Sequence, residues 1–125
     1  MAYRDLKGNH ILLRVFLGES DRDGHELLYL SIMKKAREMG LAGCTVLRGI
    51  AGFGASSVIH SDFPVEFSRD LPIVIEVSDT RERTRRFLKA VEPMLSGALV
   101  TEEKIRVIHY RHAPKKPPRP RAPRR

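Results

Sequence analysis

The sequence contains one cysteine, Cys44, so no disulfide can form within the chain of 125 residues. Such sparing use of cysteine is typical of proteins in a reducing compartment. No apolar run approaches the roughly 20 residues needed to span a bilayer, and the first ten residues lack the apolar centre of a secretory signal. We therefore expect a cytoplasmic protein with no membrane contact.

Acidic residues are missing from the end of the chain, which explains most of the net charge of +8. Residues 113–125 contain two Lys, four Arg and five Pro; without these six cations, 17 basic residues face 15 acidic ones. The prolines predict an extended, disordered basic tail after a domain of residues 1–112. Nucleic acid is not expected to bind the domain, although a tail of this kind could contact polyanions without sequence preference.

The apolar pattern predicts four strands and two helices. The strands are expected at residues 10–17, 44–50, 71–77 and 104–110. The first helix is expected at 25–39, opened by a capping box of Asp23 and Glu26 and ended by Gly40. Asp79 or Thr80 should cap the second helix, and Pro93 should shorten it. The order βαββαβ is typical of the ferredoxin-like α+β fold, one antiparallel sheet with both helices on one face.

The alternation within the strands assigns side chains to the two faces of this sheet. The helix-covered face is expected to hold aliphatic residues of the first and third strands, with Ile105 and Val107 of the last. The open face would carry Leu12, Phe16, Val74, Ile108 and Tyr110 around Arg14, Glu76 and Arg106. An exposed sheet face is usually more polar than this. We therefore expect copies of the same chain to bury it.

Glycines cluster after the second strand, in the segment GIAGFGASS of residues 49–57. The segment lacks the Gly-Lys-Ser/Thr of a Walker A loop and the spacing of a Rossmann turn. Two interpretations remain: the glycines let the chain bend, or they allow the backbone to approach a ligand closely.

Three segments carry a resemblance to a known family. FLGES at 16–20, KAREMGLAGCTVLRGIAGFGASS at 35–57 and DLPIVIEV at 70–77 resemble an uncharacterised bacterial family related to the PII signalling proteins. The resemblance spans about residues 9–110. It implies a ferredoxin-like homotrimer with a regulatory role, which senses a small molecule in the clefts between subunits and signals to a protein partner through the loop of residues 55–69.

The resemblance also implies a set of ligand-binding residues for an adenine nucleotide or another small anion. The segment at 98–103 has no glycine and places Glu102 and Glu103 where PII proteins carry a phosphate loop, so a monophosphate, a cyclic nucleotide or another small anion suits the site better than ATP. From the resemblance and the loop chemistry, the predicted ligand-binding residues are Gly49, Gly52, Gly54, Ser56, Ser57, Lys104, Arg111, Glu19 and Ser20.

No triad, paired carboxylates or activated nucleophile indicates an enzyme, and no cofactor or metal is expected. His109 and His112 lie three apart on an expected strand and should face opposite sides. Two alternatives to the regulator stay open. One is a metal-binding trimer like the copper-tolerance proteins of the same architecture, and the other is a nucleic-acid-associated module acting through the tail.

Overall fold

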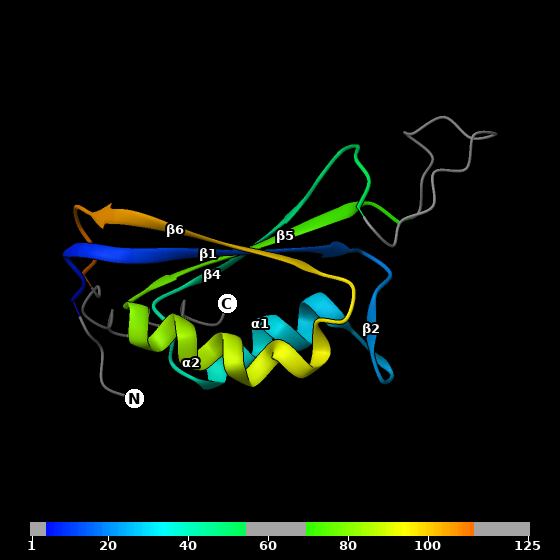
Figure 1. Ribbon diagram of the computed structural model, residues 1–125, viewed down its shortest axis with the longest axis horizontal. Coiled ribbons are helices and arrows are strands. Elements are labelled where there is room, and N and C mark those ends of the chain that lie inside the picture. Colours follow the sequence, from blue (N-terminus) through cyan, green and yellow to red (C-terminus); the bar gives the residue numbers. More distant parts are fainter. Residues whose placement is uncertain (1–4, 55–69, 112–125) are drawn as a thin grey trace, which may run out of the picture.

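The computed structural model describes residues 5–54 and 70–111. In chain order its elements are β1 (Gly8–Gly18), β2 (Arg22–Asp23), β3 (Glu26–Leu27), α1 (Leu28–Glu38), β4 (Cys44–Arg48), β5 (Pro72–Asp79), α2 (Arg81–Val91), the 3-10 helix η2 (Glu92–Met94) and β6 (Leu99–Val107). Four strands form one sheet in the order β4-β5-β1-β6, with every neighbouring pair antiparallel. Both helices lie against the same face of this sheet (Figure 1). The predicted ferredoxin-like fold is therefore confirmed.

The core lies between the sheet and the helices, as the alternation in β1 and β5 predicts. From Ile11 onward in β1, and throughout β5, every second residue is buried, while the residues between them are only half-buried. Phe87 of α2 and Ile32 of α1 are fully buried on the opposite wall. Burying a side chain of this size contributes about 1.5–3 kcal/mol. The buried aliphatic residues of the strands are Ile11, Leu13, Val15, Leu17, Ile73, Ile75 and Val77.

The start of α2 and both helix ends agree with the sequence prediction. The Thr80 hydroxyl accepts a hydrogen bond of 3.2 Å from the Arg83 backbone N–H, so Thr80 is the N-cap. The α-helix stops at Val91, and Pro93 lies in the short 3-10 helix η2 that follows. Gly40, with φ +71°, ends α1 and donates its N–H to the Arg37 carbonyl at 3.1 Å.

Asp79 ties three segments together at one end of the sheet. Its carboxylate is fully buried and accepts hydrogen bonds from the Ala42 N–H at 3.0 Å and from the Thr80 N–H at 2.7 Å. The Tyr110 hydroxyl donates to the Ala42 carbonyl at 2.7 Å. The α1–β4 connection, the start of α2 and the segment after β6 are thus joined by side-chain hydrogen bonds.

The predicted capping box at the start of α1 is wrong. Asp23 and Glu26 face each other across the small β2–β3 hairpin, and α1 begins later, at Leu28, without a side-chain cap. Instead, the Glu26 carboxylate accepts hydrogen bonds from residues of α1: from Lys34, and from the Ser31 hydroxyl at 3.0 Å. These two contacts, Lys34 first, hold the pKa of Glu26 below its usual value.

The predictions for the last strand are wrong in position and in facing. β6 spans Leu99–Val107, so most of the segment expected as a loop at 98–103 belongs to the strand. Ile105 pairs with His10 and therefore lies on the open face, whereas Lys104 and Arg106 lie toward the helices. Because β6 is an edge strand with mostly exposed residues, packing does not force its apolar residues onto the core side.

Several predicted features lie outside the described residues: Ser56, Ser57, His112, the loop of residues 55–69 and the tail of residues 113–125. Predictions about them stay predictions. Within residues 5–54 and 70–111, no helix is long and apolar enough to cross a membrane.

Candidate functional site

Residues 49–54 of the glycine segment lie at the sheet end where β1 and β4 finish and β5 starts, at the right of Figure 1. Two backbone hydrogen bonds close this end: the Glu19 N–H donates to the Leu71 carbonyl at 2.8 Å, and the Gly49 N–H donates to the Pro72 carbonyl at 2.7 Å. The Arg48 guanidinium donates to the Glu19 carboxylate at 2.8 Å. The structure therefore brings Glu19, Ser20, Gly49, Gly52 and Gly54 to one end of the molecule.

Pro72 explains why two of these positions are glycine. A Cβ at Gly49 would lie 2.7 Å from Pro72 Cγ, closer than real Cβ atoms approach their neighbours. Gly52 has φ +150°, and its Cβ would lie 3.1 Å from the same atom. The close approach expected from the sequence is thus made, at these two residues, by the backbone to a proline of its own chain.

Acidic residues after β1 and before β5 build the turn that follows β1. The Asp21 carboxylate accepts a hydrogen bond from the Gly18 N–H at 2.9 Å, and the Asp70 carboxylate accepts one from the Ser20 N–H at 3.0 Å. Glu19 is engaged by Arg48, and the side chain of Glu19 is only 24% exposed. The carboxylates therefore hold the loop geometry, and the Arg48 side chain, paired with Glu19 but 61% exposed, brings a cation beside the glycines.

Lys104 and Arg111 lie at the other end of the sheet within the same chain. Lys104 pairs with Ile11, seven residues before Gly18, which corresponds to about 23 Å along an extended strand. Arg111 follows β6, with its Nε 3.9 Å from the Asp5 carboxylate. One chain therefore does not place these two cations beside Gly52 and Gly54.

The sequence reasoning did not single out three residues of the glycine end: Arg48, Ile50 and Phe53. Arg48 is the last residue of β4, and a lone cation directly before a glycine cluster was the available signal. Ile50 and Phe53 are 92% and 75% exposed, which is unusual for large apolar side chains. Their exposure follows from the course of the loop beyond the sheet, which composition does not determine.

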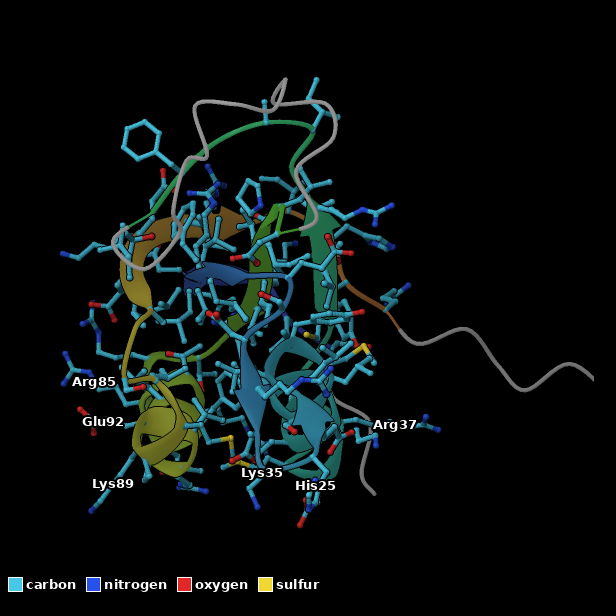
Figure 2. The ribbon with its side chains drawn as sticks, turned by 90° about the vertical axis from the view of Figure 1, so that its right-hand side faces the viewer. His25, Lys35, Arg37, Arg85, Lys89 and Glu92 are labelled. Atoms are coloured by element: carbon cyan, nitrogen blue, oxygen red, sulfur yellow. The ribbon has the colours of Figure 1, made fainter. Side chains whose placement is uncertain are left out.

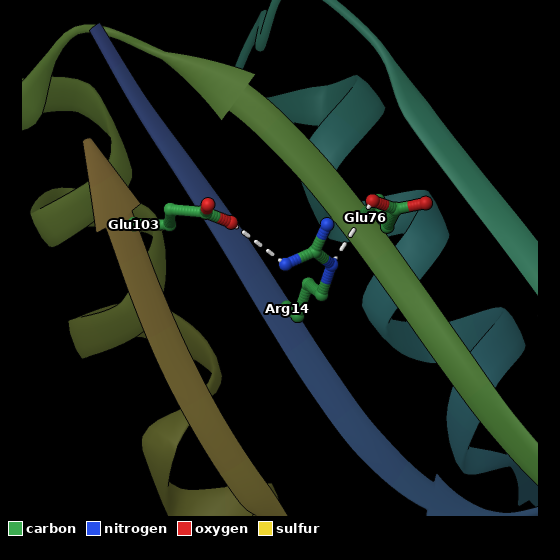
Figure 3. A network of polar contacts seen from close by, with 3 residues as sticks. All are labelled: Arg14, Glu76 and Glu103. Carbon is green, nitrogen blue, oxygen red and sulfur yellow. Dashed lines mark hydrogen bonds and ion pairs between the residues drawn. The ribbon is translucent and has the colours of Figure 1, made fainter. Parts of the chain in front are cut away.

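The open sheet face centres on Arg14, as Figure 3 shows. Its guanidinium donates to Glu103 of β6 at 2.9 Å and to Glu76 of β5 at 3.2 Å, so one side chain of β1 bridges both neighbouring strands. Glu103 first, and then Glu76, raises the pKa of Arg14 further above its already high ordinary value. Half-buried Leu12, Phe16 and Val74 lie on the same face, with Leu47 and Leu99 exposed at its edges.

Neither a metal centre nor an activated thiol is found among the residues that the structure describes. No group of three or more His, Cys, Asp or Glu side chains there has the geometry to hold a metal ion. Partial burial raises the pKa of the Cys44 thiol above its usual value. Cys44 is thus a poor nucleophile at neutral pH.

Comparison with known proteins places this arrangement in a family. Residues 10–107 match DUF190, described as an uncharacterized ACR family. A UPF0166 protein of Aquifex aeolicus is 35% identical over 98 residues, covering 78% of this chain and 92% of that protein. A UPF0166 protein of Methanocaldococcus jannaschii is 36% identical over 90 residues, covering 71% and 82%.

Among solved structures, the fold is similar to that of CPII of Thiomonas intermedia, a nitrogen regulatory PII-like protein solved with ADP, AMP and bicarbonate. The TM-score is 0.57 at 17% sequence identity, over 85% of this chain and 92% of that one. This likeness shows a shared PII-like fold. With the family match over residues 10–107, the protein belongs to the uncharacterised DUF190 family, and this chain has a PII-like, ferredoxin-like fold.

Proposed function

We propose that the protein is a PII-like regulatory protein that assembles as a homotrimer and binds an adenine nucleotide or another small anion in the clefts between its subunits. The observation that carries the proposal is the apolar open face of the sheet. The bound ADP and AMP of CPII support the choice of ligand class.

The open face has the composition of an interface. Phe16, Leu12 and Val74 stand at its centre, and Leu47 and Leu99 are 47% and 60% exposed at its edges. Apolar patches of several hundred Å² are seldom left exposed on monomers. Arg14 is already paired with two carboxylates, so no lone cation has to be desolvated when the face is covered.

A cyclic trimer also accounts for the separation of the predicted ligand residues. In such a ring, one edge of each subunit contacts the opposite edge of the next. The edges of this sheet are β4 and β6. Lys104 and Arg111 of one chain would thereby approach the glycine end of its neighbour, where Arg48 adds positive charge and Phe53 offers an apolar surface.

Regulation would then act through residues 55–69, which follow Gly54 directly in the chain. A ligand held by Gly52 and Gly54 contacts the start of this loop. Ligand binding thus has a direct route to a protein partner that recognises the loop.

The oligomeric state tests the first half of the proposal. Sedimentation of the wild-type protein at micromolar concentration should give a trimer. Phe16→Asp should dissociate it, because the change buries an unpaired charge in the interface. Met33→Asp is the matched control, since Met33 is a large side chain on α1, 36% exposed and away from the open face, and its replacement should leave the trimer intact. A monomeric wild type, or a trimer that tolerates Phe16→Asp, would refute this placement of the interface.

Ligand binding tests the second half. ADP or AMP at 100 times its dissociation constant should stabilise the wild-type trimer by about 2.7 kcal/mol, which a thermal-shift titration measures. Gly54→Val should remove this stabilisation while the protein still sediments as a trimer, because the added side chain obstructs the cleft. A trimer that no nucleotide or small anion stabilises at millimolar concentration would exclude the sensing role and leave the assembly standing.

A further inference from the structure

The near-neutral charge of the folded domain conceals an uneven distribution between its two layers. The four strands of the main sheet carry four basic and four acidic residues. The helical layer, α1 with α2 and η2, carries eight basic and three acidic residues. Five of these basic residues belong to α2 alone, which has one acidic residue, Glu82. The excess positive charge of these elements is therefore concentrated in the helical layer.

Within α2, the cations Arg81, Arg85 and Lys89 follow one another at intervals of four residues and so form a stripe on one side of the helix. Arg85 and Lys89 are exposed and make no ion pair with any residue that the structure describes. Figure 2 shows both side chains pointing away from the body of the domain. Arg81 Nη1 lies 3.8 Å from Glu102 Oε1, a long ion pair that Arg81 can give up for a phosphate.

Helix stability does not explain this stripe. Arg81 and Arg83 occupy the first turn, where the helix dipole disfavours positive charge. Cations at i and i+4 repel one another, and each such pair weakens a helix by about 0.2–0.5 kcal/mol. The apolar side of α2 is already occupied by the core, through Thr84, Phe87 and Val91. The basic side thus opposes helix formation, and contact with an external anion would reverse that effect.

We infer that the outer side of α2 binds the phosphate backbone of nucleic acid without reading its sequence. Four of the five cations of α2 are arginines, whose planar fork matches phosphate oxygens. The Arg81–Lys89 stripe spans about 12 Å, over which a duplex presents about seven phosphates. The exposed side of α2 carries no amide or aromatic side chain that could read base edges.

A bilayer surface fits α2 less well than nucleic acid does. Helices that lie in a membrane interface insert an apolar face between the lipids. In α2 the large apolar residues Phe87 and Val91 are buried in the core, and Leu88 is half-buried against it. None of the exposed large apolar side chains of the described residues belongs to α2.

Fluorescence anisotropy of the full chain with a labelled 20-base-pair duplex of arbitrary sequence tests the inference. The double variant Arg85→Glu, Lys89→Glu should bind at least tenfold more weakly, and the slope of log K against log salt should become shallower by about two, because two phosphate contacts are lost. The matched control is Lys7→Glu, Arg22→Glu, which makes the same change of charge on exposed residues outside the helical layer. It should retain most of the affinity and the original slope.

Each contrary outcome overturns the assignment. Equal losses in the two double variants would mean that only the net charge attracts the duplex. A loss confined to a full-length variant with all six tail cations of residues 113–125 replaced by Gln would assign the binding to the tail. Binding to vesicles with one-fifth phosphatidylserine, with no binding to the duplex at 50 mM salt, would show that the anion is a membrane surface.

Discussion

Replacing Gly49 with Ala separates a conformational role of this glycine from a role in ligand approach. The new Cβ would lie 2.7 Å from Pro72 Cγ and 3.4 Å from the Pro72 carbonyl oxygen. The proline ring is rigid and begins β5, so the loop has to move. That movement also breaks the 2.7 Å hydrogen bond from the Gly49 N–H to the Pro72 carbonyl.

The expected loss of stability follows from these two contacts. Overpacking of a fixed neighbour costs about 1–3 kcal/mol, and loss of a backbone hydrogen bond adds about 1 kcal/mol. Gly49→Ala should therefore lower the free energy of unfolding by about 2–4 kcal/mol, measured by urea denaturation without ligand. Gly43→Ala is the matched control: a Cβ there meets nothing within 4 Å, so the change should be neutral or stabilising by up to about 1 kcal/mol.

A third variant ties the loss to Pro72. In the double variant Gly49→Ala, Pro72→Ala the clashing Cγ is absent, so the combined destabilisation should be at least about 1 kcal/mol smaller than the sum of the two single effects. If Gly49→Ala is as stable as Gly43→Ala, or if Pro72→Ala relieves nothing, the packing explanation fails. The glycine would then have to be explained by what approaches it from outside the chain.

Two further predictions concern α2 and β4. Thr80→Ala should lower the free energy of unfolding by about 1 kcal/mol, since the Arg83 N–H loses its acceptor. Thr80→Ser retains a hydroxyl and should lose much less stability. Equal losses for the two variants in urea denaturation would show that the hydroxyl does not cap the helix. The Cys44 thiol should react with a thiolate-specific reagent more slowly than a small thiol does at pH 8, because partial burial raises the pKa of Cys44 above its usual value. An equal rate in the native and the urea-unfolded protein would contradict that effect of burial.

The two central strands and the second helix were predictable from the sequence, because each had one dominant constraint. Ile11 to Leu17 alternate between a packed core and an open face, so a period of two is required. Thr80 and Pro93 mark the beginning and end of α2 by local chemistry. At the start of α1, Asp23 and Glu26 had the spacing of a capping box, but Glu26 gains more from Lys34 and Ser31. Because the Glu26 side chain can bond either to residues before it or to residues after it, the sequence does not determine where α1 begins.

The site was predictable only in part, for a reason that lies in strand register. Glu19 and Gly49 come together because they directly follow β1 and β4, and that neighbourhood follows from the fold. The facing of Ile105 and the distant position of Lys104 depend on which residue of β1 pairs with each. On an exposed edge strand, no apolar pattern encodes that register. Only the ladder itself shows that Lys104 lies far from the glycines of its own chain.

The two ends of the sheet are held together by different kinds of contact. At one end, a buried carboxylate and the Tyr110 hydroxyl fasten three chain segments to one another, so a displacement there would disturb the α1–β4 connection and α2 together. At the other end, the Gly49 and Glu19 N–H groups bond to carbonyls at the start of β5, Arg48 pairs with Glu19 at the surface, and exposed Ile50 and Phe53 extend beyond the sheet. The side-chain contacts are thus buried at the Asp79 end and exposed at the glycine end. Water therefore competes with the side-chain contact at the glycine end and is excluded from the Asp79 carboxylate.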